Sequence, residues 1–189
     1  MTSQAVEIPG YISGTWDLDP VHTTIGFVAR HLMVSKVRGR FTKFEGQIVT
    51  APDPLDSSAT VTVDLSSVDT GNETRDNDLR SENFFDVATH PQMTFRSTGI
   101  HPEGDRFAAA GDLTIHGVTR RVILMVEVNG FGSDPYGGTR AGFSATGEID
   151  RTEFGITFNA PVPGSGGVVV SERIQLDIEV EAVLRKGQA

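Results

Sequence analysis

The residues best suited to chemistry lie in one polar stretch, Ser67 to Phe95, which reads SVDTGNETRDNDLRSENFFDVATHPQMTF. Arg75 and Asp76 are adjacent within it, and Asn72 has a side chain of the type that caps a helix N-terminus. An arginine presents fixed donors to an anionic or carbonyl oxygen, and a neighbouring aspartate can orient it. The same pair also fits a solvated helix face, where an ion pair contributes only about 0.3 kcal/mol. Both interpretations stay open at this point.

Other kinds of reactive site find little support. The five histidines show no ligand spacing such as HxH or HExxH, and the chain has no cysteine, so we predict no metal site. Gly164-Ser165-Gly166-Gly167 is neither a G-x-S-x-G nucleophile motif nor part of a βαβ nucleotide-binding unit. The remaining catalytic alternative is His31 as a general base with Arg75 stabilising charge. Because no paired carboxylates or activated nucleophile support it, we predict no enzyme, no catalytic residue and no cofactor.

The elements that must position these residues are β-strands. Apolar and polar residues alternate over most of the chain, most clearly in residues 174–181, and turn signals recur about every ten residues. One dry and one wet face on each strand predicts an antiparallel sandwich or barrel. The run from His22 to His31 places Ile25, Phe27 and His31 on one face. Residues 119–128 are apolar on both faces, which predicts an outer cover such as a partner subunit.

The stretch from Ser67 to Phe95 is an insert between two central strands. Hairpin loops usually take about two to five residues, and much longer ones are usually lids or binding loops. We predict a short polar helix that includes residues 75–80, with Asn72 as its N-cap, Glu73 in its first turn and His90-Pro91 as a stop. The insert also carries Phe84 and Phe85, which would close one end of a barrel.

Phenylalanine dominates the aromatic residues, with Phe 11 against Tyr 2 and Trp 1. For any single phenylalanine, core packing is the simplest explanation. The set as a whole favours an apolar cavity, because an eight-stranded barrel is wide enough to hold one small ligand when side chains do not fill it. We predict that the tail of such a ligand contacts Ile25, Phe27, Phe41, Phe44, Phe84, Phe85, Phe95, Leu124, Phe143 and Phe154.

Composition limits the remaining classes. The chain of 189 residues predicts a single barrel domain over 14–186, preceded by a flexible arm over 1–13. A net charge of -9 disfavours nucleic acid and anionic membranes as partners. No signal peptide is visible, and no apolar run approaches the roughly 20 residues of a membrane helix. With no cysteine, the chain also fits a reducing compartment, so we expect a cytoplasmic protein.

Several motifs occur in a characteristic order: Trp16-Asp17-Leu18-Asp19-Pro20-Val21-His22, Phe27 with His31, Gly39-Arg40-Phe41, Thr70-Gly71-Asn72 with Arg75-Asp76, Phe84-Phe85-Asp86, His90-Pro91 with Phe95, Gly111-Asp112-Leu113-Thr114-Ile115-His116-Gly117-Val118-Thr119, and Arg151 with Phe154-Gly155. Together they resemble the YceI family, whose members are lipocalin-like antiparallel barrels that bind polyisoprenoids and other long amphiphiles. The resemblance runs from Trp16 to the last strand. Thr23, where serine is more frequent, and His90, where tyrosine is common, depart from the family pattern.

The resemblance implies an all-β, eight-stranded lipocalin-like barrel threaded by a hydrocarbon chain, often in a homodimer, with no known catalysis. The expected function is binding, transport or storage of a long-chain isoprenoid lipid, either a polyprenyl phosphate or pyrophosphate or an isoprenoid quinone. Arg75 is the first candidate for the head group, followed by His31, Asn72 and Asp76. Two alternatives stay open: a filled barrel that serves as an interaction module, and an enzyme acting on an amphiphilic ligand.

Overall fold

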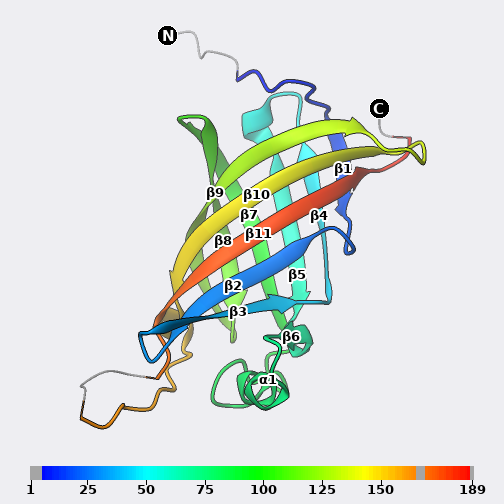
Figure 1. Cartoon of the computed structure of the whole chain (residues 1–189). Helices are drawn as coiled ribbons and strands as arrows, with labels where there is room; N and C mark the ends of the chain where they lie inside the picture. The colour runs from blue at the N-terminus through cyan, green and yellow to red at the C-terminus, as the bar shows by residue number, and fades with distance from the viewer. Residues whose placement is uncertain (1–5, 165–168, 188–189) are drawn as a thin grey trace.

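The computed structural model describes residues 6–164 and 169–187. One antiparallel sheet curls round and closes on itself (Figure 1). Its strands are β1 (Gly14–Leu18), β2 (Thr24–His31), β3 (Ser35–Phe41), β4 (Phe44–Thr50), β5 (Ser58–Asp64), β6 (Val68–Asp69), β7 (Gln92–Glu103), β8 (Arg106–Ile115), β9 (Val118–Ser133), β10 (Thr139–Asp150) and β11 (Arg173–Leu184). The helices are the 3-10 turns η1 (Pro54–Asp56), η2 (Leu65–Ser67) and η3 (Arg151–Phe154), and α1 (Glu73–Arg80).

The eleven strands form an eight-stranded barrel because three barrel strands are each broken in two. β1 and β2 both pair with β11, and they pair with β4 and β3 respectively, so β1–β2 and β3–β4 are two interrupted strands. β5 pairs with β4 and β6 with β3, so β5–β6 is the third. Every barrel strand lies beside its neighbours in sequence, and the β1–β11 pairing closes the ring. The eight-stranded antiparallel barrel predicted from the sequence is therefore confirmed.

The insert lies at one end of the barrel and the described N-terminal segment at the other (Figure 1). Asn72 caps α1 as predicted, because its side-chain oxygen accepts a hydrogen bond of 2.9 Å from the Arg75 amide. The helix begins at Glu73, directly after this cap, so the predicted cap and first turn are confirmed. Within the described residues, no helix is long and apolar enough to cross a bilayer.

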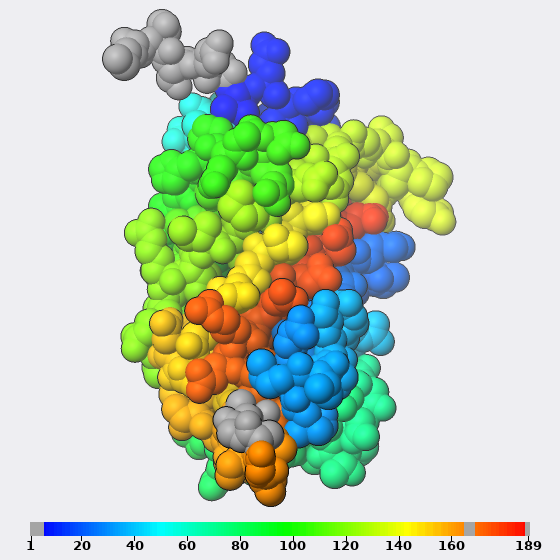
Figure 2. All heavy atoms as spheres, turned by 60° about the vertical axis from the view of Figure 1, so that its left-hand side comes forward, coloured from blue at the N-terminus to red at the C-terminus, as the bar shows by residue number. Residues whose placement is uncertain are grey.

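The wall of the barrel is continuous where β10, β11 and β2 lie side by side as diagonal bands (Figure 2). At the N-terminal end of the lumen, Trp16 is 0% exposed and donates from Nε1 to the Thr50 hydroxyl at 2.8 Å. Tyr11 packs nearby, with its ring 5.4 Å from that of Phe131 and its hydroxyl donating to the Ala51 carbonyl at 2.7 Å. Residues from the predicted arm thus contact the barrel.

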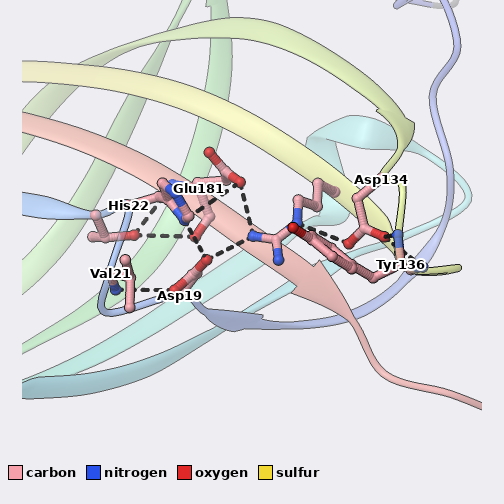
Figure 3. A network of polar contacts seen from close by, with 9 residues as sticks. Asp19, Val21, His22, Asp134, Tyr136 and Glu181 are labelled. Carbon is pink, nitrogen blue, oxygen red and sulfur yellow. Dashed lines mark hydrogen bonds and ion pairs between the residues drawn. The ribbon is translucent and has the colours of Figure 1, made fainter.

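An ion-pair network joins the bend between β1 and β2 to the outer wall (Figure 3). Nη1 of Arg140 donates to Asp19 at 2.6 Å and to Glu181 at 2.8 Å, and its Nε donates to Asp134 at 2.9 Å. Burial alone would raise the pKa of the Asp19 carboxyl, but hydrogen bonds from His22 and Arg140 outweigh burial and lower that pKa to about 2. The hydrogen bond to Asp19 and the charge of Glu181 raise the pKa of His22.

We expect Arg140→Met to lower the urea midpoint of unfolding near pH 6, because it removes charge-assisted hydrogen bonds to three carboxylates. Asp19 contributes stability above its unfolded pKa of 3.8, and that contribution is lost as the pH falls towards 2. His22 acts in the opposite sense because its pKa is raised by folding. Its contribution to stability is complete below its unfolded pKa of 6.5 and is lost as the pH rises past its pKa in the folded protein. Urea unfolding at pH 3 and pH 6 measures the effect of Asp19, and unfolding at pH 6 and about pH 9 measures that of His22.

The matched control for Arg140→Met is Arg173→Met, because the single ion pair of Arg173 with Glu148 lies in a largely exposed position. We expect the control to shift the urea midpoint much less than Arg140→Met does. Two results would contradict a stabilising role of the network. One is that both variants unfold at the same urea concentration; the other is that the stability of Arg140→Met falls as much between pH 6 and pH 3 as that of the parent protein.

Candidate ligand cavity

The barrel encloses a cavity of about 320 Å³, at the lower end of the range typical of small-molecule sites. Its lining comes from all eight barrel strands, together with residues of the insert and of the N-terminal segment. The period-two alternation explains the lining, since successive strand residues point to opposite faces of the sheet. In β9 the inward residues include Val122 and Leu124, and in β11 they include Leu176 and Ile178. The lumen is therefore walled almost entirely by hydrocarbon.

Such a lumen suits an apolar guest. Transfer of hydrocarbon out of water contributes about 0.8 kcal/mol for each buried methylene. A polar group without a hydrogen-bond partner would be penalised in the same space. The few polar residues of the lining, such as Tyr11, Thr50 and Arg151, already hydrogen-bond to other parts of the protein. The arrangement can hold a hydrocarbon chain and offers little to a polar one.

The structure places nine of the ten predicted tail residues around this cavity: Ile25, Phe27, Phe41, Phe84, Phe85, Phe95, Leu124, Phe143 and Phe154. The tenth, Phe44, is outside the lining and packs at the edge of the cluster that contains Ile25, Phe41 and Val63. Sequence position could not separate Phe44 from the others, because β4 begins at this residue directly after the break that follows β3. Contact of these side chains with a ligand stays a prediction.

Three of the four predicted head-group residues meet at the N-terminus of α1, around Thr70. Arg75 donates from Nε to the Thr70 hydroxyl at 2.7 Å and from Nη2 to the Thr70 carbonyl at 2.8 Å. Asp76 is buried and accepts from the Thr70 amide and hydroxyl at 3.0 and 2.6 Å. Asn72 is occupied as the helix cap. None of the three is among the lining residues, so their role towards a head group stays a prediction.

His31, the fourth predicted head-group residue, lies apart from the other three. Ile25, Phe27 and Ala29 of β2 line the cavity, and His31 continues the same face of the strand. Its side chain is exposed because it lies at the end of β2, past the last lining residue of that strand, and it forms a β-bridge to Val170. The structure therefore does not bring His31 and Arg75 into one site within the cavity lining.

Arg151, for which the sequence predicted no role, lines the insert end of the cavity and is only 5% exposed. Its guanidinium donates to the carbonyls of Ser171 at 3.0 Å, Ile156 at 2.8 Å and Phe158 at 2.9 Å. Its Cζ lies 5.8 Å from the centre of the Phe84 ring, a cation–π distance. Burial lowers the pKa of Arg151. The only feature in the sequence that pointed to Arg151 was its place as a single arginine shortly before residues 155–171, a run that contains no charged residue.

The tertiary structure also brings together three residues that the sequence pattern separated: Asp86, His90 and His116. One donor atom from each lies within 4.8 Å of the other two. The sequence prediction of no metal site considered spacing along the chain alone. Spacing along the chain cannot reveal this group, because His116 comes from the turn between β8 and β9, whereas Asp86 and His90 belong to the insert.

The fold and its cavity define a class of closed antiparallel β-barrels with an apolar lumen. Residues 16–182 match the family model described as a YceI-like domain. The chain belongs to the YceI family.

Protein YceI of Salmonella newport is 38% identical over 171 residues, covering 90% of this chain and 86% of the relative. The crystal structure of Burkholderia cenocepacia BcnA has a TM-score of 0.75 at 25% identity, covering 87% of this chain and 98% of BcnA. A polyisoprenoid binding domain from Saccharophagus degradans has a TM-score of 0.66 at 16% identity, covering 92% of this chain and all of that domain, and at that identity it shows the fold alone.

Proposed function

We propose that this protein binds a long-chain isoprenoid lipid, with the hydrocarbon tail inside the barrel, and carries or stores it. The observation that carries the proposal is the cavity of about 320 Å³ with its hydrocarbon walls. The name of the Saccharophagus degradans domain, a polyisoprenoid binding domain of the same fold, supports it. Burial of a few isoprene units offsets the cost of ordering the chain, because each methylene contributes about 0.8 kcal/mol.

We propose that the head group, a polyprenyl phosphate or pyrophosphate or a quinone ring, lies at the insert end. Arg151 lines this end of the cavity. Arg75 lies one helical turn before Leu79, a lining residue of α1, so both are on the same side of the helix. An anionic or carbonyl oxygen emerging beside Leu79 would meet Nη1 of Arg75, since Nε and Nη2 already donate to Thr70. Asn72 and Asp76 hold that turn of the backbone.

Organic extraction of the purified protein, followed by mass spectrometry, tests the proposal. We expect an isoprenoid lipid at close to one molecule for each chain, and its mass identifies both the chain length and the head group. Protein stripped of lipid should bind an added prenyl lipid, measured by fluorescence competition. Repeated recovery of no lipid, together with no binding of added polyprenyl phosphate or quinone, would contradict the proposal and favour the interaction module.

The oligomeric state and location complete the proposal. We propose a homodimer formed through the outer face of β9, where Ile123 is 58% exposed. An apolar side chain on the outer face of a strand that is also apolar inside gains from an outer cover. A cytoplasmic location is proposed on the composition of the chain, which has no cysteine.

A further inference from the structure

Three side chains suited to metal binding converge beside the insert end of the barrel. Asp86 and His90 belong to the insert, and His116 belongs to the turn between β8 and β9. One oxygen or nitrogen donor from each lies within 4.8 Å of the others, and the two imidazole rings have their centres 4.7 Å apart. We infer that Asp86, His90 and His116 form a binding site for a divalent transition-metal ion of the zinc class.

Backbone geometry holds the three residues in place. The Asp86 carbonyl accepts hydrogen bonds from the amides of Thr89 at 3.0 Å and His90 at 2.8 Å, so a single turn of chain brings Asp86 and His90 together. His116 and Gly117 occupy the β8–β9 hairpin turn with φ values of 56° and 72°. Two positive φ values in succession are typical of a tight hairpin turn, and histidine is among the residues that tolerate that region.

Two glycines make room for the imidazole rings. A Cβ atom added at Gly117 would lie 2.9 Å from Cε1 of His90, and one added at Gly155 would lie 3.3 Å from Nδ1 of His116. All three ligand side chains are partly buried, so the surrounding chain limits their rotamers while solvent still reaches them. A metal ion therefore has an entry path to ligands that are already held near one another.

The donors of the group are not committed to other partners. Among residues 6–164 and 169–187, no hydrogen bond or ion pair involves the Asp86 carboxylate, the His90 ring or the His116 ring. The second acid–histidine group of the described chain, Asp19 with His22 and Glu181, differs in this respect. There Arg140 binds both carboxylates, so a cation is already present.

The donor set selects the kind of metal. Two imidazoles and one carboxylate are ligands of Zn²⁺ and of first-row ions such as Co²⁺ and Fe²⁺, whereas Mg²⁺ and Ca²⁺ prefer oxygen alone. Metal–ligand bonds of about 2.0–2.2 Å place tetrahedral donors on the order of 3.3 Å apart, which small side-chain rotations can reach from the present spacing. Three protein ligands leave a fourth coordination position open.

The position of the site suggests what could occupy the open coordination position. Phe85, Ile115 and Phe154 all line the cavity, and each directly precedes a residue of the site or the glycine beside it. A phosphate oxygen at the insert end of the cavity would be a suitable fourth ligand. This extension rests on the proposed function, whereas metal binding itself does not.

Titration of the metal-free, full-length protein with Co²⁺, followed by visible absorption and by Zn²⁺ competition, tests the site. We expect one ion for each chain and a four-coordinate spectrum that Zn²⁺ abolishes. His90→Gln and His116→Gln should each raise the Kd at least about tenfold, and Asp86→Asn should act in the same direction. His22→Gln, from the acid–histidine group that Arg140 already occupies, and His101→Gln, at an exposed position of β7, are the matched controls and should leave the Kd unchanged.

Several results would overturn the site: no stoichiometric binding of Co²⁺ or Zn²⁺, or binding that survives in the His90→Gln/His116→Gln double variant. Circular dichroism of each variant separates loss of the ligand from loss of the fold. Zn²⁺ should also tighten binding of a polyprenyl phosphate and leave that of a quinone unchanged. If Zn²⁺ binds but no prenyl lipid does, the proposed function fails while the metal site stands.

Discussion

Ala145→Phe is expected to weaken binding of prenyl lipids by more than about 100-fold, because the ring takes space inside the lumen that the lipid tail needs. Ala145 lies on β10, is 8% exposed and lines the cavity of about 320 Å³. If the ring displaces about four methylenes of the tail, the loss is about 3 kcal/mol, which corresponds to that change in Kd. The substitution adds hydrocarbon to a hydrocarbon wall, so it introduces no buried charge. Fluorescence competition with a prenyl lipid gives the Kd of each variant.

The neighbouring position provides the matched control. Thr146 follows Ala145 on the same strand and its side chain is exposed on the outer face, so Thr146→Phe adds the same ring outside the barrel. We expect the control to bind lipid as the parent protein does. Urea unfolding of both variants reports any loss of fold. Parent-like binding by a folded Ala145→Phe protein would show that the lipid is held somewhere other than the lumen.

Arg151→Met is expected to lower the free energy of unfolding by about 3 kcal/mol. Arg151 is 5% exposed, and its guanidinium donates to the carbonyls of Ser171, Ile156 and Phe158, which belong to the segment that follows η3. Methionine fills much of the volume but donates no hydrogen bond, so the buried carbonyls of Ser171 and Ile156 and the partly buried carbonyl of Phe158 lose this donor. Each unsatisfied buried group costs about 1–3 kcal/mol, and partial access of water reduces the sum. The midpoint of urea unfolding measures the loss.

Arg151→Lys separates charge from geometry. Lysine keeps the positive charge but presents a single ammonium group, so it can satisfy only some of the carbonyls that the planar guanidinium reaches. We expect it to recover less than half of the lost stability. Arg106→Met, at an exposed position at the start of β8, should change stability by less than about 0.5 kcal/mol. Equal stability of Arg151→Met and the parent would mean that the carbonyls find other donors.

Much of the fold and of the cavity wall follows from local pattern. Residues 174–181 alternate with period two, and the structure has them in β11 with Leu176 and Ile178 facing the cavity. The helix of the insert could also be predicted from the sequence, since Asn72 caps α1 as its residue type indicates. Within an unbroken strand, side-chain direction follows the parity of the position, so sequence can assign most lining residues. Parity changes at an irregularity, as in β7, where the lining passes from Ser97 to Ile100. The sequence failed to separate Phe44, which lies at a break between strands, where parity does not carry over from one side to the other.

The polar contacts at the insert end of the barrel could not be predicted from local sequence pattern. Alternation determined an antiparallel sandwich or barrel with an apolar interior, and capping determined the helical insert, because both are properties of neighbouring residues. The choice of an eight-stranded barrel came from the resemblance to the YceI family. Only the tertiary structure decided that Arg75 turns to Thr70, that Arg151 is buried among carbonyls, and that His90 meets His116. These contacts depend on how the insert and the β8–β9 turn come together at one end of the barrel. No short-range sequence pattern specifies how close those two segments lie.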